Sequence, residues 1–306
     1  MKHSSAMHKT IKAGVYMIAA FAGMLTAPVY AQSDAQTDAA EDPAGAPYVM
    51  PETEVWDMDA AHGERYRIYV SRPDGDAPEG GYPVLYVLDG NAMFAGFAEA
   101  RRIQSVYDKG LDKMIVVAIG YPNTELYDGR RLGDFTPPIE TPELKEMFAA
   151  YPSGKQDEFS AFLLDEVRPE IERRYSVDKR RQSLFGHSLG GLFALHILYT
   201  KPSAFHTIVA TSPSIWWDNQ SILEEERAFT SRLKKKPFPT SRVVLLTGEL
   251  EEEEVVVGDT IALGKRLEAL SGYGLRSGYA VLDKETHITV PARAVTATMR
   301  AVMQRP

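Results

Sequence analysis

One short stretch of the sequence carries the residue types that nucleophilic catalysis requires. Gly186-His187-Ser188-Leu189-Gly190 matches the pattern G-x-S-x-G. A strand-like run at 182–185 precedes it and a helical pattern at 189–199 follows it, as this motif requires. Glycines beside Ser188 remove side chains that would collide in a sharp strand-to-helix turn. Such a pattern also arises by chance in glycine-rich turns, but because both flanking elements are present, the sequence predicts Ser188 as a nucleophile.

A serine hydroxyl is a weak nucleophile at neutral pH, so a base must accept its proton. In chains with this motif the order is serine, then acid, then histidine, which leaves three of the seven histidines as candidates. His196 falls within the helix after Ser188 and His206 falls at the start of a strand, so we expect both to be packed or solvated. His287 lies in a loop between the last strand and the last helix, and we predict that it is the base.

The acid that orients the histidine is expected after the apolar strand at 243–246. A carboxylate there would fix the tautomer of His287 and stabilise its protonated form. Glu251 has the commoner spacing from the preceding glycine, and Glu249 is the alternative. Both belong to an acidic cluster that is also typical of a solvated loop, and a Ser/His pair without an acid stays open.

Negative charge on a carbonyl oxygen under attack needs two backbone N–H donors. One is the N–H of the residue after the nucleophile, here Leu189. The other is expected after the strand at 84–88, in Asp89-Gly90-Asn91, and we predict the Asn91 N–H, with Asp89 holding the loop. The sequence has no H-E-x-x-H zinc motif and no phosphate-binding loop, so it implies no metal and no cofactor.

From about position 51, short β-rich runs alternate with longer helical patterns, which is typical of a mostly parallel sheet covered by helices. Several of the runs are continuously apolar, as expected of strands buried on both faces. The predicted class is therefore α/β, with the α/β-hydrolase fold: a mostly parallel twisted sheet with helices on both faces. We predict strands at 65–70, 84–88, 114–119, 182–185, 207–210, 243–246 and 276–281, and helices at 92–109, 156–174, 189–199, 219–233, 259–271 and 291–304.

The proline-containing segment at 121–154 joins a predicted strand to a predicted helix. A connection of this length is usually functional or disordered. In this fold it would cross the carboxyl end of the sheet, where ligands bind. We therefore expect it to contribute to substrate binding.

Composition narrows the function classes. A chain of 306 residues with 44% hydrophobic and 25% charged residues can build one large core. Its 34 basic and 42 acidic residues give a net charge of −8, which argues against nucleic acid or an anionic membrane as a partner. The absence of cysteine excludes disulfides, cysteine catalysis, thiolate metal sites and a lipid-bearing cysteine.

The amino-terminal residues resemble a secretory signal. Lys2, Lys9 and Lys12 precede an uncharged apolar run at 13–25, and small residues before Gln32 offer a cleavage site. A membrane anchor is the alternative, but the run is shorter than the ~20 residues that a bilayer core requires. We expect a signal peptide at 1–31, a flexible spacer at 32–50 and an esterase domain at 51–306. Cleavage would remove three lysines and no acidic residue, so the mature chain would have a net charge of −11. We expect a soluble protein of the periplasm.

Three stretches resemble the serine esterases that open the trilactone ring of enterobactin-type siderophores, especially the periplasmic branch. They are the run from Tyr82 to Asn91 that ends in Leu-Asp-Gly-Asn, the run from Gly186 to Leu195, and Ser212-Pro213-Ser214-Ile215-Trp216-Trp217. The first and third are narrow signals, whereas many hydrolases share the second. The resemblance extends from about position 51 to the carboxyl terminus.

This resemblance implies that Ser188 and His287 are the catalytic pair and that some relatives lack an acid. It also points to Arg130 as a substrate contact, since a guanidinium can pair with the oxygens of an anionic catecholate or stack on its rings; a surface arginine is the alternative. Trp216 and Trp217 are candidates for an aromatic wall, and we expect only one of them to face ligand.

The expected partner is a small-molecule ester. In the leading hypothesis this ester is the trilactone of a ferric catecholate siderophore. A feruloyl, acetyl or other small ester is the second hypothesis, because the wider esterase superfamily acts on such substrates. A siderophore-binding protein without turnover is the third, since fold alone does not imply activity.

Overall fold

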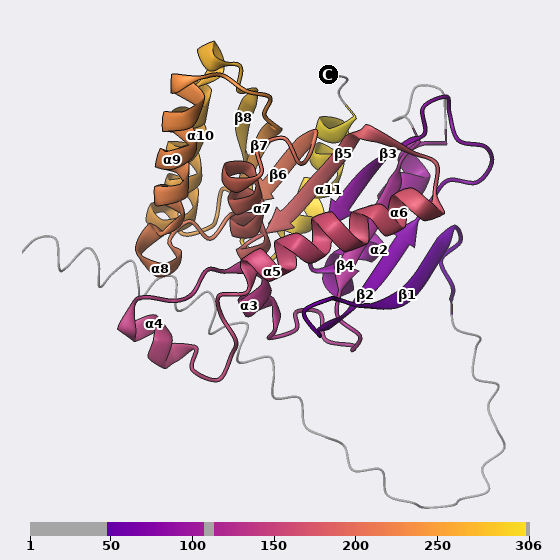
Figure 1. Ribbon diagram of the computed structural model, residues 1–306, viewed down its shortest axis with the longest axis horizontal. Coiled ribbons are helices and arrows are strands. Elements are labelled where there is room, and N and C mark those ends of the chain that lie inside the picture. Colours follow the sequence, from indigo (N-terminus) through magenta and orange to yellow (C-terminus); the bar gives the residue numbers. More distant parts are fainter. Residues whose placement is uncertain (1–47, 107–112, 304–306) are drawn as a thin grey trace, which may run out of the picture.

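The computed structural model describes residues 48–106 and 113–303. Its centre is an eight-stranded sheet of order β1-β2-β4-β3-β5-β6-β7-β8 (Figure 1). β1 pairs antiparallel with β2 and β2 with β4, whereas all later neighbours are parallel. The strands are β1 (Thr53–Asp59), β2 (Arg65–Ser71), β3 (Tyr82–Val87), β4 (Ile115–Gly120), β5 (Val177–His187), β6 (Thr207–Thr211), β7 (Arg242–Gly248) and β8 (Ser277–Leu282).

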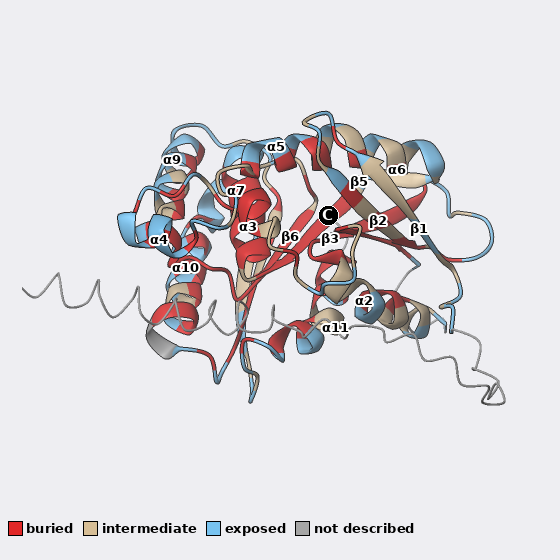
Figure 2. Ribbon diagram, turned by 90° about the horizontal axis from the view of Figure 1, so that it is seen from below, coloured by how far each residue is buried: buried red, intermediate tan, exposed pale blue. Residues whose placement is uncertain are grey.

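Helices cover both faces of this sheet. In Figure 2, α5 and α6 lie over one face, and α2 and α11 lie over the other. A π-helical turn, η1 (Phe162–Val167), joins α5 to α6. The helices are α2 (Gly90–Gln104), α3 (Arg131–Phe135), α4 (Pro142–Met147), α5 (Gln156–Ala161), α6 (Arg168–Arg174), α7 (Leu189–Thr200), α8 (Trp217–Gln220), α9 (Ile222–Lys235), α10 (Gly258–Glu268) and α11 (Val290–Val302), with short turns η2 (Glu253–Val257) and η3 (Ser271–Tyr273).

Side-chain alternation along the strands divides the core between the two faces. Val84 and Tyr86 of β3 belong to the cluster that includes the buried side chains of α7. Leu85 and Val87 belong to a second cluster with residues of α2 and α11. Each fully buried aliphatic side chain contributes about 1.5–3 kcal/mol to folding, so the central strands are held from both sides.

The predicted fold class is confirmed by the sheet and its helices. Each predicted strand and helix has a counterpart in the structure. Positions 107–109 and 304, at the ends of two predicted helices, lie outside the described residues. The predicted signal peptide and the part of the spacer up to position 47 also lie outside them. The sequence analysis missed β1, α3 and α4. Within the described ranges, no helix is both long and apolar enough to span a membrane.

Candidate active site

Ser188 lies in the turn between β5 and α7 and has a positive φ, 58°, with ψ of −120°. A non-glycine residue adopts such a conformation only where the surrounding structure enforces it. The Ser188 N–H donates to the carbonyl of Thr211 at the end of β6. Glycine is required at 186 because a Cβ there would lie 2.0 Å from the carbonyl oxygen of Gly190. The turn therefore presents a partly exposed Ser188 at the carboxyl end of the sheet.

The loops after β7 and β8 bring a histidine and a carboxylate to this serine. Nε2 of His287 lies 3.1 Å from Oγ of Ser188, and Nδ1 of His287 lies 2.7 Å from Oε2 of Glu251. Because a carboxylate oxygen only accepts, Nδ1–H donates to Glu251 and Nε2 accepts the Ser188 hydroxyl. Glu249 does not make this contact, since its carboxylate accepts the backbone N–H of Lys284.

A second histidine ring packs beside the first. The rings of His187 and His287 have centroids 4.6 Å apart, and His187 is 1% exposed. Burial, with a smaller contribution from His287, holds the pKa of His187 well below its ordinary value. His187 is therefore neutral at physiological pH and places no charge beside the ring that would become protonated.

The two predicted oxyanion donors lie in the first turns of helices that begin at this edge. Leu189 is the first residue of α7 and Asn91 is the second of α2, so neither N–H has an acceptor within its helix. The Asn91 side chain holds the segment after β4: its Oδ1 accepts the Tyr121 N–H at 2.8 Å and its Nδ2 donates to the carbonyls of Tyr121 and Asn123. The amide thus fixes the start of α2 against that segment.

The 121–154 segment contacts residues that follow two strands at the carboxyl edge of the sheet. After β3, the buried Asp89 receives two hydrogen bonds from Arg131, at 2.7 and 2.9 Å. After β6, the carboxylate of Asp218 accepts the backbone N–H groups of Glu140 and Thr141. These two anchors hold the segment over strands on either side of β5.

Arg130 lies in this segment beside Arg131, and its side chain is 30% exposed. Its guanidinium contacts the carboxylates of Asp128 and Glu64, each at 3.3 Å, and lies 4.7 Å from the centre of the Tyr121 ring. Lys155 also pairs with Glu64, at 2.8 Å. The positive charge of Arg130 is therefore largely balanced by neighbouring carboxylates, which the sequence did not indicate.

The expectation that one tryptophan faces ligand is wrong in this structure. Trp216 is 5% exposed and Trp217 is fully buried. The Trp217 ring packs against Phe148, with centroids 5.4 Å apart, and against Trp216. Both rings are part of the main core, so neither forms an open aromatic wall.

Sequence reasoning singled out the stretch from Ser212 to Trp217 as a resemblance but assigned no role to its two serines, which contact the array. The Ser212 hydroxyl donates to Oε1 of Glu251 at 2.5 Å, and Oγ of Ser214 lies 3.3 Å from Oγ of Ser188. Both serines follow β6, the strand next to β5, and neighbouring parallel strands end at the same edge of a sheet. This position was the signal that could have placed them near Ser188.

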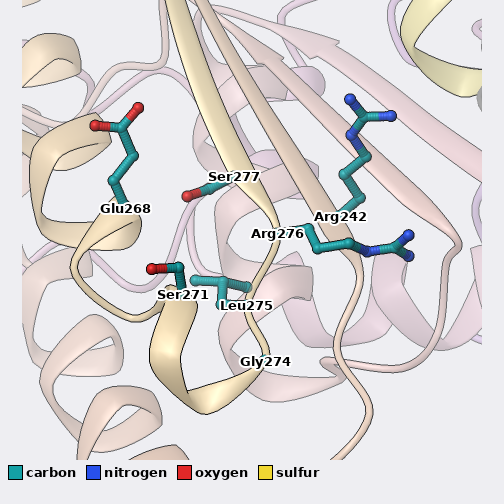
Figure 3. Close-up of a pocket in the computed structure, with 7 residues that line it drawn as sticks. All are labelled: Arg242, Glu268, Ser271, Gly274, Leu275, Arg276 and Ser277. Atoms are coloured by element: carbon teal, nitrogen blue, oxygen red, sulfur yellow. The ribbon is translucent and has the colours of Figure 1, made fainter.

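A shallow pocket lies elsewhere, at the amino-terminal ends of β7 and β8. Arg242, Arg276 and Ser277 are among its lining residues (Figure 3). It is at the opposite end of these strands from Glu251 and His287, so we assign it no part in the chemistry. In the described part of the chain, no group of three or more His, Asp or Glu side chains is arranged to hold a metal ion.

Comparison with known proteins shows the family to which the chain belongs. The model of the family described as putative esterase matches residues 60–270. The chain is 38% identical over 265 residues to the ferri-bacillibactin esterase BesA of Bacillus subtilis, covering 83% of this chain and 90% of BesA.

Two solved structures share the fold at similar identity. The BES protein from Bacillus cereus has a TM-score of 0.78 at 37% identity, covering 86% of this chain and 98% of that one. The siderophore hydrolase EstA from Aspergillus nidulans has a TM-score of 0.73 at 31% identity, covering 85% and 98%. From the extent of the family match and the identity to BesA, the chain belongs to the putative esterase family and is a carboxylic ester hydrolase of the α/β-hydrolase fold.

Proposed function

We propose that this protein hydrolyses esters through an acyl-enzyme formed on Ser188. The observation that carries the proposal is the continuous array from Ser188 Oγ through His287 to Glu251, with contacts of 3.1 and 2.7 Å. Oγ attacks the ester carbonyl while Nε2 of His287 takes its proton, which then passes to the leaving alcohol. A water deprotonated by the same nitrogen attacks the acyl-enzyme and releases the acid. Glu251 holds the ring tautomer and stabilises the imidazolium.

The backbone N–H groups of Leu189 and Asn91 stabilise the tetrahedral oxyanion in this proposal. Both belong to the first turn of a helix, where the N–H groups have no acceptor within the helix and the helix dipole favours negative charge. The hydrogen bonds of the Asn91 side chain to Tyr121 and Asn123 keep the second donor in place. Donors that are fixed before the reaction need no reorganisation as the charge develops.

The proposed substrate is the trilactone of a catecholate siderophore. Support comes from the relatives, since BesA is named for ferri-bacillibactin and EstA is named a siderophore hydrolase. Arg130 is the proposed contact for the catecholate. Because carboxylates already balance its charge, stacking of a ring on the guanidinium is favoured over simple charge attraction.

Apolar side chains beside the array suit the aromatic part of such a substrate. Ile288 follows His287 and is 64% exposed, and Leu250 precedes Glu251 and is 61% exposed. The Leu250 N–H donates to the carbonyl of Glu285, so the two loops that carry them are adjacent. We propose that Leu250 and Ile288 form the apolar contact with substrate that the sequence analysis assigned to Trp216 and Trp217.

Chromatography of an enterobactin-type trilactone after incubation with the protein tests this function. We expect the cyclic ester to be converted to its linear trimer, and Ser188→Ala to leave it intact. Hydrolysis of a nitrophenyl ester with an unchanged trilactone would favour another small ester as substrate. Binding of the trilactone without turnover of either ester would instead identify a siderophore-binding protein.

We further propose export to the periplasm with removal of residues 1–31. The basic start, the apolar run at 13–25 and the small residues before Gln32 support it, although these residues lie outside the described part of the chain. Mass spectrometry of the native protein is expected to find an amino terminus at Gln32 in the periplasmic fraction. Retention of Met1 would overturn the proposal.

A further inference from the structure

The tripeptide Ser212-Pro213-Ser214 follows β6 and touches both ends of the Ser188, His287 and Glu251 array. We infer that Ser212 and Ser214 are positioning residues for the proposed ester hydrolysis, Ser212 acting through Glu251 and Ser214 through Ser188. The inference rests on the proposed function. Neither serine is more than 2% exposed, so neither is placed to bind substrate directly.

Ser212 determines which oxygen of Glu251 remains for the histidine. Oε1 of Glu251 accepts the Ser212 hydroxyl and the Gly248 N–H, each at 2.5 Å, and the Thr247 hydroxyl at 3.3 Å. Oε2 is left facing Nδ1 of His287. Because the Glu251 side chain is fully buried, these donors take the place of water and hold the carboxylate in one orientation.

The backbone fixes the direction of the Ser212 hydroxyl. Ser212 has φ of 44°, in the left-handed region, and its N–H donates to the carbonyl of Leu246 in β7 at 2.7 Å. A non-glycine residue in this region costs about 1–3 kcal/mol and persists where the surroundings enforce it. The strained turn therefore aims the hydroxyl at Glu251, which follows the same strand as Leu246.

Ser214 holds the other end of the array. Its N–H donates to the Ser188 carbonyl at 3.1 Å, and its Oγ lies 3.3 Å from the Ser188 Oγ. A hydroxyl has one hydrogen, and that of Ser188 points to His287, so the hydrogen between the two serines belongs to Ser214. This bond favours the Ser188 rotamer that faces His287 and stabilises negative charge developing on the nucleophile.

Pro213 makes the tripeptide a rigid connection. A Cβ on Gly191 in the first turn of α7 would lie 3.0 Å from Cα of Pro213, so a larger residue there would have to displace the tripeptide. Proline also fixes its own φ. The spacing between the two hydroxyls is thereby set by the backbone, and both ends of the array are held from one segment.

Single variants Ser212→Ala and Ser214→Ala test the inference, with Ser241→Ala as matched control. Ser241 immediately precedes β7 and is also fully buried; its hydroxyl donates to the carbonyl of Phe205 at 2.7 Å, and its Oγ lies 3.1 Å from the carbonyl oxygen of Pro202. We expect each test variant to lower kcat on a neutral nitrophenyl ester about tenfold at nearly unchanged KM, the effect of one lost hydrogen bond to a charged group. The control should lose thermal stability without losing kcat.

Ser212→Gly guards against a folding defect, because glycine removes the hydroxyl yet adopts φ of 44° without strain. We expect this variant to be as slow as Ser212→Ala but no less thermally stable than it. Full activity of Ser212→Gly would overturn the role of the hydroxyl.

A double variant identifies the route of action. If Ser212 acts only through Glu251, Ser212→Ala combined with Glu251→Gln loses no more kcat than Glu251→Gln alone. Independent multiplication of the two losses would contradict the inference. A wild-type kcat in Glu251→Gln would also contradict the inference for Ser212. The proposed function itself is tested separately, by the variants of Ser188 and His287.

The rate at which a fluorophosphonate reacts with the protein reports on the nucleophile itself. In that reaction the Ser188 Oγ bonds to phosphorus, fluoride leaves, and His287 takes the hydroxyl proton. Ser214→Ala is expected to slow this step about tenfold and Ser241→Ala not at all. Equal rates in wild type and Ser214→Ala would overturn the role of Ser214, whereas no reaction in wild type would count against the proposed nucleophile.

Discussion

The hydroxyl oxygen of Ser188 lies 3.1 Å from Nε2 of His287, although 99 positions separate the two residues along the chain. Ser188 follows β5 and His287 follows β8, with β6 and β7 between them. Parallel strands end at the same edge of a sheet, so loops from distant parts of the chain meet there. The proposed reaction depends on this approach, because a base within hydrogen-bond reach can take the hydroxyl proton.

Removal of either partner is expected to abolish most of the activity. Ser188→Ala and His287→Ala should each lower kcat by roughly 10³ or more, and the double variant should lose little more, because the pair acts as a unit. Steady-state kinetics on a nitrophenyl ester measures this. Losses that multiply in the double variant would contradict the assignment.

Paired variants distinguish between the two candidate carboxylates, those of Glu251 and Glu249. Glu251→Gln should lower kcat by about tenfold or more, because an amide cannot orient and stabilise the imidazolium as a carboxylate does. Glu249→Gln is the matched control, since its carboxylate accepts the Lys284 N–H rather than contacting His287. Wild-type kcat in Glu251→Gln would indicate a Ser/His pair that works without an acid.

Arg130→Ala is expected to discriminate between substrates. We expect kcat/KM for a catecholate trilactone to fall about tenfold, or ~1.4 kcal/mol, with a neutral nitrophenyl ester nearly unaffected. Lys155→Ala is the control, because Lys155 pairs with the same Glu64 but is not the proposed contact. Stacking is screened by salt less than ion pairing, so the trilactone effect should persist at high ionic strength.

Equal losses on both substrates would assign Arg130 a structural role instead. A route for such a role exists, because Arg130 contacts Asp128, which accepts from Asn123, which accepts from the Asn91 side chain. No loss on either substrate would remove the support that Arg130 gives to a siderophore substrate.

Asp134 is expected to make stability depend on pH. It is 2% exposed and accepts the hydroxyls of Tyr66 and Tyr121, and burial raises its pKa to about 7. The folded state therefore binds this proton more tightly than the unfolded chain, so stability falls as pH rises from about 4 to 7. With about 1.4 kcal/mol per pKa unit, ionisation at pH 8 costs the folded state on the order of 4 kcal/mol.

Urea unfolding of Asp134→Asn between pH 5 and 8 measures this contribution. The neutral amide has no such proton to lose, so the free energy of unfolding of the variant minus that of wild type should increase toward pH 8. Parallel profiles would mean that Asp134 keeps an ordinary pKa. Arg130 lowers the pKa of Asp134 and Glu64 raises it. Both residues are present in wild type and in Asp134→Asn.

The sequence by itself determined the features that depend on local pattern. The Ser188 motif, the apolar strands and the helical periodicity are each contained within about twenty residues, and the order serine, acid, histidine then selects His287. The edge strand β1 was missed because its sequence, TEVWDMD, is acidic and half-exposed. Its pairing with β2 is supported by the contact of Arg67 with Asp57, which a local pattern does not reveal.

Only the tertiary structure decided which side chains meet. Glu249 and Glu251 are two positions apart on one loop, and the backbone path after β7 turns Glu251 toward His287. Ser212 reaches Glu251 across 39 positions. The buried Trp217 ring packs against Phe148, which lies 69 positions earlier in the chain. Motif order and spacing named His287 and Glu251 as candidates, but contacts such as those of Ser212 and Trp217 arise from how strands and loops pack in space, which local patterns do not reveal.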